Sequence, residues 1–116
     1  MRNKILIASN LPDDKTELEP CRFNDILDAL KEVHHLKGVL YGNYVSSNVD
    51  EKDSVAFTAV YLQIKNKQRR IQNIITFMQK DIVDDDIKQA LLDSLLDLSV
   101  YAAMGVDMWF ERFGDG

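Results

Sequence analysis

Two aspartates interrupt an otherwise apolar stretch, LLDSLLDLSVYAAM, at residues 91–104. Asp93 and Asp97 are four positions apart, so on a helix they lie about 40° from each other, and Tyr101 continues the same stripe one turn later. The rest of the circumference is mostly apolar, about twice the width that an ordinary surface helix needs. Such a helix is expected to be surrounded by protein, and its acidic stripe then either meets water or faces a polar cavity.

A second unusual segment, IKNKQRRIQN at residues 64–73, carries cations on an amphipathic helix. At about 100° per residue, Lys67 falls on the apolar side of this helix and Arg70 borders that side. Burying an unpaired lysine is costly. Lys67 is therefore expected to snorkel to the surface, to pair with one of the two aspartates, or to meet the phosphate of a ligand in a polar pocket between helices.

The spacing of apolar residues predicts three main helices that position these side chains. They cover about residues 23–37, 54–80 and 86–110, and Gly38 is the expected stop of the first. Residues 4–8 are expected to form a short strand or an extended arm, followed by a linker at 10–20, and a loop is expected at 41–53. We predict an all-α fold, a compact helical bundle of three main helices plus an N-terminal arm. In this division residues 1–20 are arm and linker, and residues 21–116 form one domain.

Composition is consistent with one globular domain, because 46% of the 116 residues are hydrophobic. The net charge of −5 argues against non-specific nucleic-acid binding, which needs a basic face. One cysteine excludes an intrachain disulfide, and the short apolar run near the start suits neither a signal peptide nor a membrane span. The expected location is the cytoplasm of a cell or of a virus's host, with no membrane partner.

The helix over residues 86–110 is expected to be the most buried element. The predicted core residues on it are Leu92, Leu95, Leu96, Ala103 and Val106. Its apolar arc is wider than one chain of this length needs, and Trp109 and Phe110 extend it. We therefore expect the bundle to be completed by formation of a homo-oligomer.

The order of these motifs resembles that of small phage-encoded MazG-like proteins associated with nucleotide modification. The resemblance covers about residues 24–108. Its motifs are, in chain order, a basic residue followed by Tyr-Gly at Lys37, Tyr41 and Gly42, then KxxR at Lys67 and Arg70, then DxxxDxxxYA from Asp93 to Ala102. The wider superfamily contains the all-α nucleoside-triphosphate pyrophosphohydrolases, which are helical bundles, usually dimers or higher oligomers.

The resemblance implies a nucleotide-binding protein of phage nucleotide metabolism that uses Mg²⁺ to convert a nucleoside triphosphate to the monophosphate and pyrophosphate. Asp93 and Asp97 would be the catalytic residues and metal ligands. The substrate would be bound by Lys67, Arg70, Tyr41, Asn43, Tyr101 and Lys37. The sequence departs from the enzymes of the superfamily, because it has KNKQRR where they carry ExxE, and DxxxD where they carry ExxD.

This departure keeps a second class of function open. A non-catalytic phage protein could sequester a nucleotide or nucleotide second messenger, or inhibit a host or defence protein by direct binding. The number of carboxylates near the basic residues discriminates between the two classes. Four carboxylates would favour hydrolysis, and two or fewer would favour binding.

Overall fold

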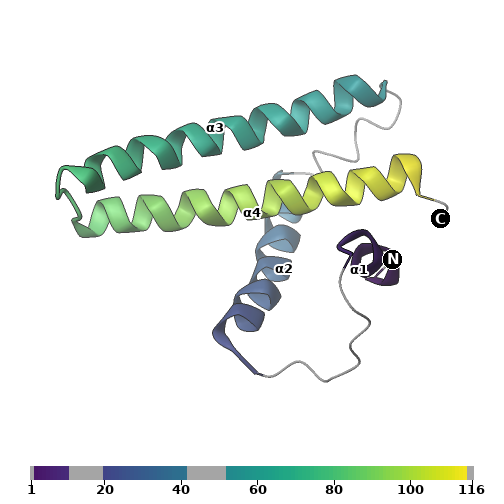
Figure 1. Cartoon of the computed structure of the whole chain (residues 1–116), viewed down its shortest axis with the longest axis horizontal. Helices are drawn as coiled ribbons and strands as arrows, with labels where there is room; N and C mark the ends of the chain where they lie inside the picture. Colours follow the sequence, from purple (N-terminus) through teal and green to yellow (C-terminus); the bar gives the residue numbers. More distant parts are fainter. Residues whose placement is uncertain (1, 11–19, 42–51, 115–116) are drawn as a thin grey trace.

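The computed structural model describes the backbone of residues 2–10, 20–41 and 52–114, and the side chains of residues 4–10, 20–36 and 52–114. Its helices are α1 (Arg2–Ala8), α2 (Arg22–Tyr41), α3 (Asp53–Gln79) and α4 (Asp85–Phe113). Figure 1 shows α3 and α4 lying side by side as a long antiparallel hairpin, with α2 crossing α4 steeply and α1 near the C-terminal end of α4. Within the described ranges there is no strand, and the predicted all-α class is confirmed.

Three predictions about individual elements were wrong. The segment predicted as a strand or extended arm is the helix α1, which satisfies its backbone locally, as in the hydrogen bond from the Ser9 amide to the Ile5 carbonyl at 3.0 Å. Helix α2 continues through Gly38, the predicted stop. Helix α4 extends past residue 110 to Phe113, where the Gly114 amide donates to the Phe110 carbonyl at 2.9 Å. The linker at 11–19 and the loop at 42–51 lie outside the described residues.

The turn between α3 and α4 is specified by local hydrogen bonds. Asp81 adopts a left-handed conformation with φ of 60°. Its amide donates to the Met78 carbonyl and the Ile82 amide donates to the Phe77 carbonyl, both at 3.0 Å. This is the Schellman pattern, which satisfies carbonyls at a helix end and reverses the chain. The hairpin is thus encoded by the short segment that joins its helices.

Asp84 begins α4 by accepting a hydrogen bond at Oδ1 from the Ile87 amide at 2.9 Å. Replacing Asp84 with Ala should lower the free energy of unfolding by about 0.5–2 kcal/mol, because one amide of the first turn loses its partner. Urea denaturation measures this change. The variant Asp84→Asn keeps an acceptor oxygen and should stay close to wild type, so an equal loss in both variants would contradict the assignment of Asp84 as a cap.

The contact between α3 and α4 contains most of the buried side chains. Among the described residues, the buried ones are Ala56, Val60 and Ile74 on α3 and Ser94, Val100 and Met108 on α4. Small residues allow the two backbones to approach closely, and a Cβ added at Gly105 would lie 3.3 Å from Val60 Cγ1. The open end of the hairpin is closed by Arg112, whose Nη1 donates to Asp53 Oδ1 at 2.9 Å.

Aromatic rings reinforce that open end. Phe57 of α3 stacks on Phe113 of α4 with ring centroids 5.7 Å apart and an interplanar angle of 4°. Trp109 packs edge-on against both Phe110 and Phe113. The Phe57–Phe113 contact joins the end of α4 to the beginning of α3, and the contacts of Trp109 stabilise the last two turns of α4 itself.

The prediction of which side of α4 faces the core was wrong. In the single chain Leu92, Leu95 and Val106 are about half exposed, Ala103 is exposed and Leu96 is half-buried. Helix α4 instead turns its more polar side toward α3. Two local features explain this choice, because Ser94 is small enough for close helix approach and Asp97 meets a cation there.

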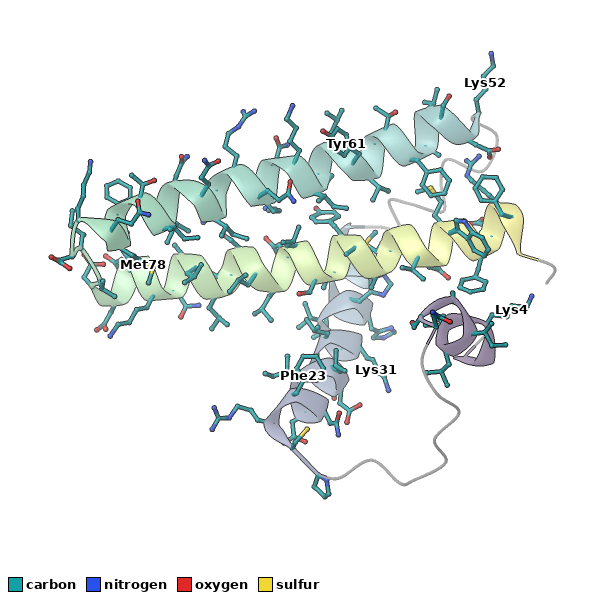
Figure 2. The ribbon with its side chains drawn as sticks, viewed as in Figure 1. Lys4, Phe23, Lys31, Lys52, Tyr61 and Met78 are labelled. Carbon is teal, nitrogen blue, oxygen red and sulfur yellow. The ribbon has the colours of Figure 1, made fainter. Side chains whose placement is uncertain are left out.

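Helix α2 packs against α4 through an open groove of about 490 Å³. Phe23, Leu27 and Leu30 line it from α2, and Val100, Ala103 and Met104 line it from α4. Figure 2 labels Phe23 and Lys31 on this helix and Lys4 on α1.

No helix in the described parts of the chain is long and apolar enough to cross a membrane.

Candidate functional site

Lys67 and Asp97 form an ion pair at the middle of the helical hairpin. Lys67 Nζ lies 3.1 Å from Asp97 Oδ2, and each side chain is 21% exposed. The predicted proximity of these two residues across adjacent helices is confirmed. Each residue interrupts an apolar helix face, and each gains a partner that compensates for its partial removal from water. The remaining exposure leaves room for a ligand to reach the ammonium group.

The side chains next to this pair on α4 are also directed toward α3. Ser94 is fully buried, and its Oγ donates to the Ala90 carbonyl at 2.8 Å. Tyr101, one turn after Asp97, is half-buried. The acidic stripe found in the sequence therefore does not point uniformly into water. Its central part faces the neighbouring helix and places polar atoms inside the hairpin.

Asp93 has a different environment from Asp97. Its side chain is exposed, and its Oδ1 accepts a hydrogen bond from Gln89 Nε2 at 2.9 Å. The two carboxylates lie one helical turn apart on the same stripe. One is therefore paired with a lysine inside the hairpin, while the other is reachable from solvent at its edge.

Arg70 is exposed and follows Lys67 by three positions, so the two lie within about 60° of each other around α3. The apolar groove lined by Tyr61 and Val106 marks one side of the hairpin. Helical spacing places Arg70 and Asp93 on the opposite side. That side, which we call the charged face, consists of Lys67, Arg70, Asp93 and Asp97.

The structure does not place the side chains of three predicted substrate-binding residues. Helix α2 includes the backbone of Lys37 and Tyr41, whose side chains are outside the described set. Asn43 lies outside the described residues altogether. Contacts of these residues with a ligand stay predictions.

The carboxylates on the charged face fit Mg²⁺ only together with ligands that a phosphate and water would supply. Among the described residues there is no group of three or more His, Cys, Asp or Glu side chains placed to hold a metal ion. Magnesium commonly takes one or two protein carboxylates together with phosphate oxygens and water. Asp93 and Asp97 meet that minimum, provided that the phosphates supply further ligands.

Two structural features, one stripe on α4 and one ion pair, were not predicted from the sequence. Ser94 and Met108 are fourteen positions apart with Tyr101 midway, so they share a stripe of seven-residue spacing on α4. That spacing was a usable signal for the side that meets α3. The ion pair of Asp53 with Arg112 joins residues 59 positions apart and had no local signal in the sequence.

Comparisons of the chain with protein-family models, with curated proteins and with solved structures found no match. Function is therefore inferred from the residues and geometry of the hairpin.

Proposed function

We propose that the chain binds a phosphorylated nucleotide on the charged face of the α3–α4 hairpin. The observation that supports this most directly is the half-buried contact of Lys67 with Asp97. An ammonium group held in place by a carboxylate is already oriented, so it loses little conformational entropy when a phosphate oxygen becomes its second partner. Arg70, three positions along α3, adds a planar donor group suited to phosphate.

The remaining ligand contacts extend from this pair. Tyr101 lies one turn from Asp97 and offers a ring and a hydroxyl to the base or sugar. Lys37, Tyr41 and Asn43, which follow one another near the C-terminal end of α2, complete the proposed contacts. Mg²⁺ entering with the phosphates would be held by Asp93 and Asp97, where it would neutralise phosphate charge and acidify a bound water.

The fate of the bound nucleotide separates two candidate functions. Hydrolysis of a nucleoside triphosphate to monophosphate and pyrophosphate is what the resemblance to MazG-like proteins implies. Sequestration without hydrolysis is favoured by one specific observation: the described residues contain two carboxylates on the charged face and no third ligand placed beside them. Pyrophosphate release by the purified protein distinguishes these two functions.

Adjacent arginines provide a matched test of the binding surface. Arg70 lies on the charged face, whereas helical spacing points Arg69 away from α4, and both side chains are exposed. Arg70→Ala should weaken binding of a nucleoside triphosphate with Mg²⁺ by about ten- to a hundredfold, the loss expected for one charged hydrogen-bonding partner. Arg69→Ala should change the affinity by less than about threefold.

Isothermal titration calorimetry with the four common nucleoside triphosphates measures these affinities. Both arginine variants should retain the helical circular-dichroism spectrum of wild type, because neither residue is buried. Absence of measurable binding to wild type, or equal weakening by the two substitutions, would remove the charged face as the nucleotide site.

A further inference from the structure

The apolar groove between α1, α3 and α4 has the size and the lining of a small-molecule site. Its volume is about 920 Å³, and pockets for small molecules usually measure about 300–1,000 Å³. Aromatic residues dominate the two long walls: Phe57 and Tyr61 on α3, and Trp109, Phe110 and Phe113 on α4. Tyr61 and Trp109 are about half exposed, so a bound apolar group would cover ring surface that now meets water.

The charge of the groove indicates which polar group its ligand carries. Lys4 of α1 lines the groove, whereas none of the described carboxylates does, although the chain contains 19 Asp and Glu residues. Asp107, on the same part of α4, lines the groove toward α2 instead. The described residues include no ion-pair partner for Lys4. The groove is therefore complementary to an apolar ligand with an anionic group.

The cation and the apolar lining are arranged along the length of the groove. Helix α1, which carries Lys4, lies near the C-terminal end of α4 (Figures 1 and 2), while Ile64 and Ala102 line the groove nearer the middle of the hairpin. Ala102 and Phe113 are about 16 Å apart along α4. An extended hydrocarbon chain advances about 1.3 Å per carbon, since each C–C bond is about 1.5 Å long. This length suits a chain of about twelve carbons.

We propose that the groove binds a single-chain anionic amphiphile, a fatty acid of about ten to fourteen carbons, taken up as a free molecule. Its hydrocarbon chain lies on the rings of Tyr61 and Trp109, and its carboxylate pairs with the ammonium group of Lys4. Removal of the methylene groups from water supplies most of the affinity. Because Lys4 is exposed, its charge contributes selectivity for an anion more than affinity. The charged face is on the opposite side of the hairpin, so this site is separate from the proposed nucleotide site.

The dimensions of the groove favour a hydrocarbon chain over a partner helix. A helix with its side chains is about 10–12 Å across, so a length of about 16 Å occupies roughly 1,300–1,800 Å³. The groove is smaller, and α1 bounds its third side. A partner helix could enter only if α1 moved away, whereas a hydrocarbon chain fits beside α1 where it stands.

Calorimetric titration with dodecanoate, below the concentration at which it forms micelles, tests the proposal. Wild type should bind about one molecule per chain with a Kd of about 1–100 μM, and decanoate should bind about tenfold more weakly because it buries two fewer methylene groups. The emission of Trp109, the single tryptophan, should shift to shorter wavelength over the same titration. Absence of binding, or equally tight binding of dodecyltrimethylammonium, would overturn the proposal.

Matched variants test the position of the ligand. Val106 lines the groove and is 47% exposed, and Leu62, which helical spacing points away from α4, is 50% exposed. Val106→Glu should weaken dodecanoate binding by at least about a hundredfold, because its carboxylate lies where the apolar chain would pack. Leu62→Glu should change the affinity by less than about threefold. Equal affinities of these two variants, both folded, would overturn the proposal.

The lysine provides a test that does not depend on the folding of Val106→Glu. Lys4 is exposed, so Lys4→Gln should fold as wild type does. It should weaken dodecanoate binding by about three- to tenfold and leave binding of the uncharged dodecanol unchanged. Lys88→Gln, at an exposed position outside the groove, should alter neither affinity. Equal effects of Lys4→Gln on the two ligands would overturn the proposal.

Two further results would assign the groove to a different occupant and overturn the proposal. One is sedimentation of wild type with vesicles of anionic phospholipid when free dodecanoate does not bind, which would indicate a membrane surface. The other is a stable protein complex, with a second copy or another chain, that shields Trp109 and excludes dodecanoate.

Discussion

Replacing Met108 with Ala is expected to lower the free energy of unfolding by about 2–5 kcal/mol, the largest effect of any single substitution considered for this chain. Met108 is 1% exposed and packs with Ala56 and Val60 at the centre of the buried cluster. The Asp53–Arg112 ion pair joins the two helices four positions, about one turn, beyond Met108. The helices therefore cannot easily close the cavity that the missing side chain leaves.

Urea denaturation at one fixed protein concentration measures this loss, because association would make the apparent stability depend on concentration. Met78→Ala is the matched control. Met78 lies near the turn of the hairpin and is half-buried (Figure 2), so its truncation should have a smaller effect. Equal losses at the two positions would show that Met108 is not part of a well-packed core.

Replacing Asp97 alone with Leu is expected to lower the free energy of unfolding by about 2–3 kcal/mol. The substitution leaves Lys67 half-buried without its carboxylate partner, and its partial exposure keeps the loss below that of a fully buried pair. The double variant Lys67→Met with Asp97→Leu should recover most of the stability, since apolar residues of similar volume often replace a buried pair without loss. Asp93→Leu, at an exposed position, should change stability by less than about 0.5 kcal/mol.

The same double variant connects stability with function. If the pair serves a nucleotide site, the folded double variant should not bind nucleoside triphosphates with Mg²⁺ in a calorimetric titration. Equal binding by wild type and double variant would show that the pair is structural only. A double variant less stable than Asp97→Leu alone would contradict the energetic account of the pair.

The sequence predicted the long helices well because each has an independent local signal. The aspartates before α4 and the apolar spacing of α3 place the starts of both helices within one residue of the structure. The contact of Lys67 with Asp97 was also predictable, because each charge interrupts an apolar face and adjacent antiparallel helices bring such positions together.

The rotational phase of α4 could not be obtained by assigning its most apolar side to the core. Apolar residues occupy most of its circumference, so the hydrophobic pattern does not single out one direction. Helix packing instead selected the side where Ser94 permits close approach and Asp97 finds Lys67. Leu95 and Val106 were consequently left on the outside of the single chain.

The two charged contacts of the hairpin together fix the register of its helices. Lys67–Asp97 lies at the middle and Asp53–Arg112 at the open end, about 21 Å apart along the helix axes. Sliding α4 by a single turn, about 5.4 Å, would break both contacts at once. A stripe of apolar residues alone tolerates such a slip, because each apolar residue meets another one after it. Two ion pairs at different positions along the helix axes do not tolerate it, because both would lose their partners. The two ion pairs therefore fix the axial offset between α3 and α4, and any assembly built on the hairpin has this same offset.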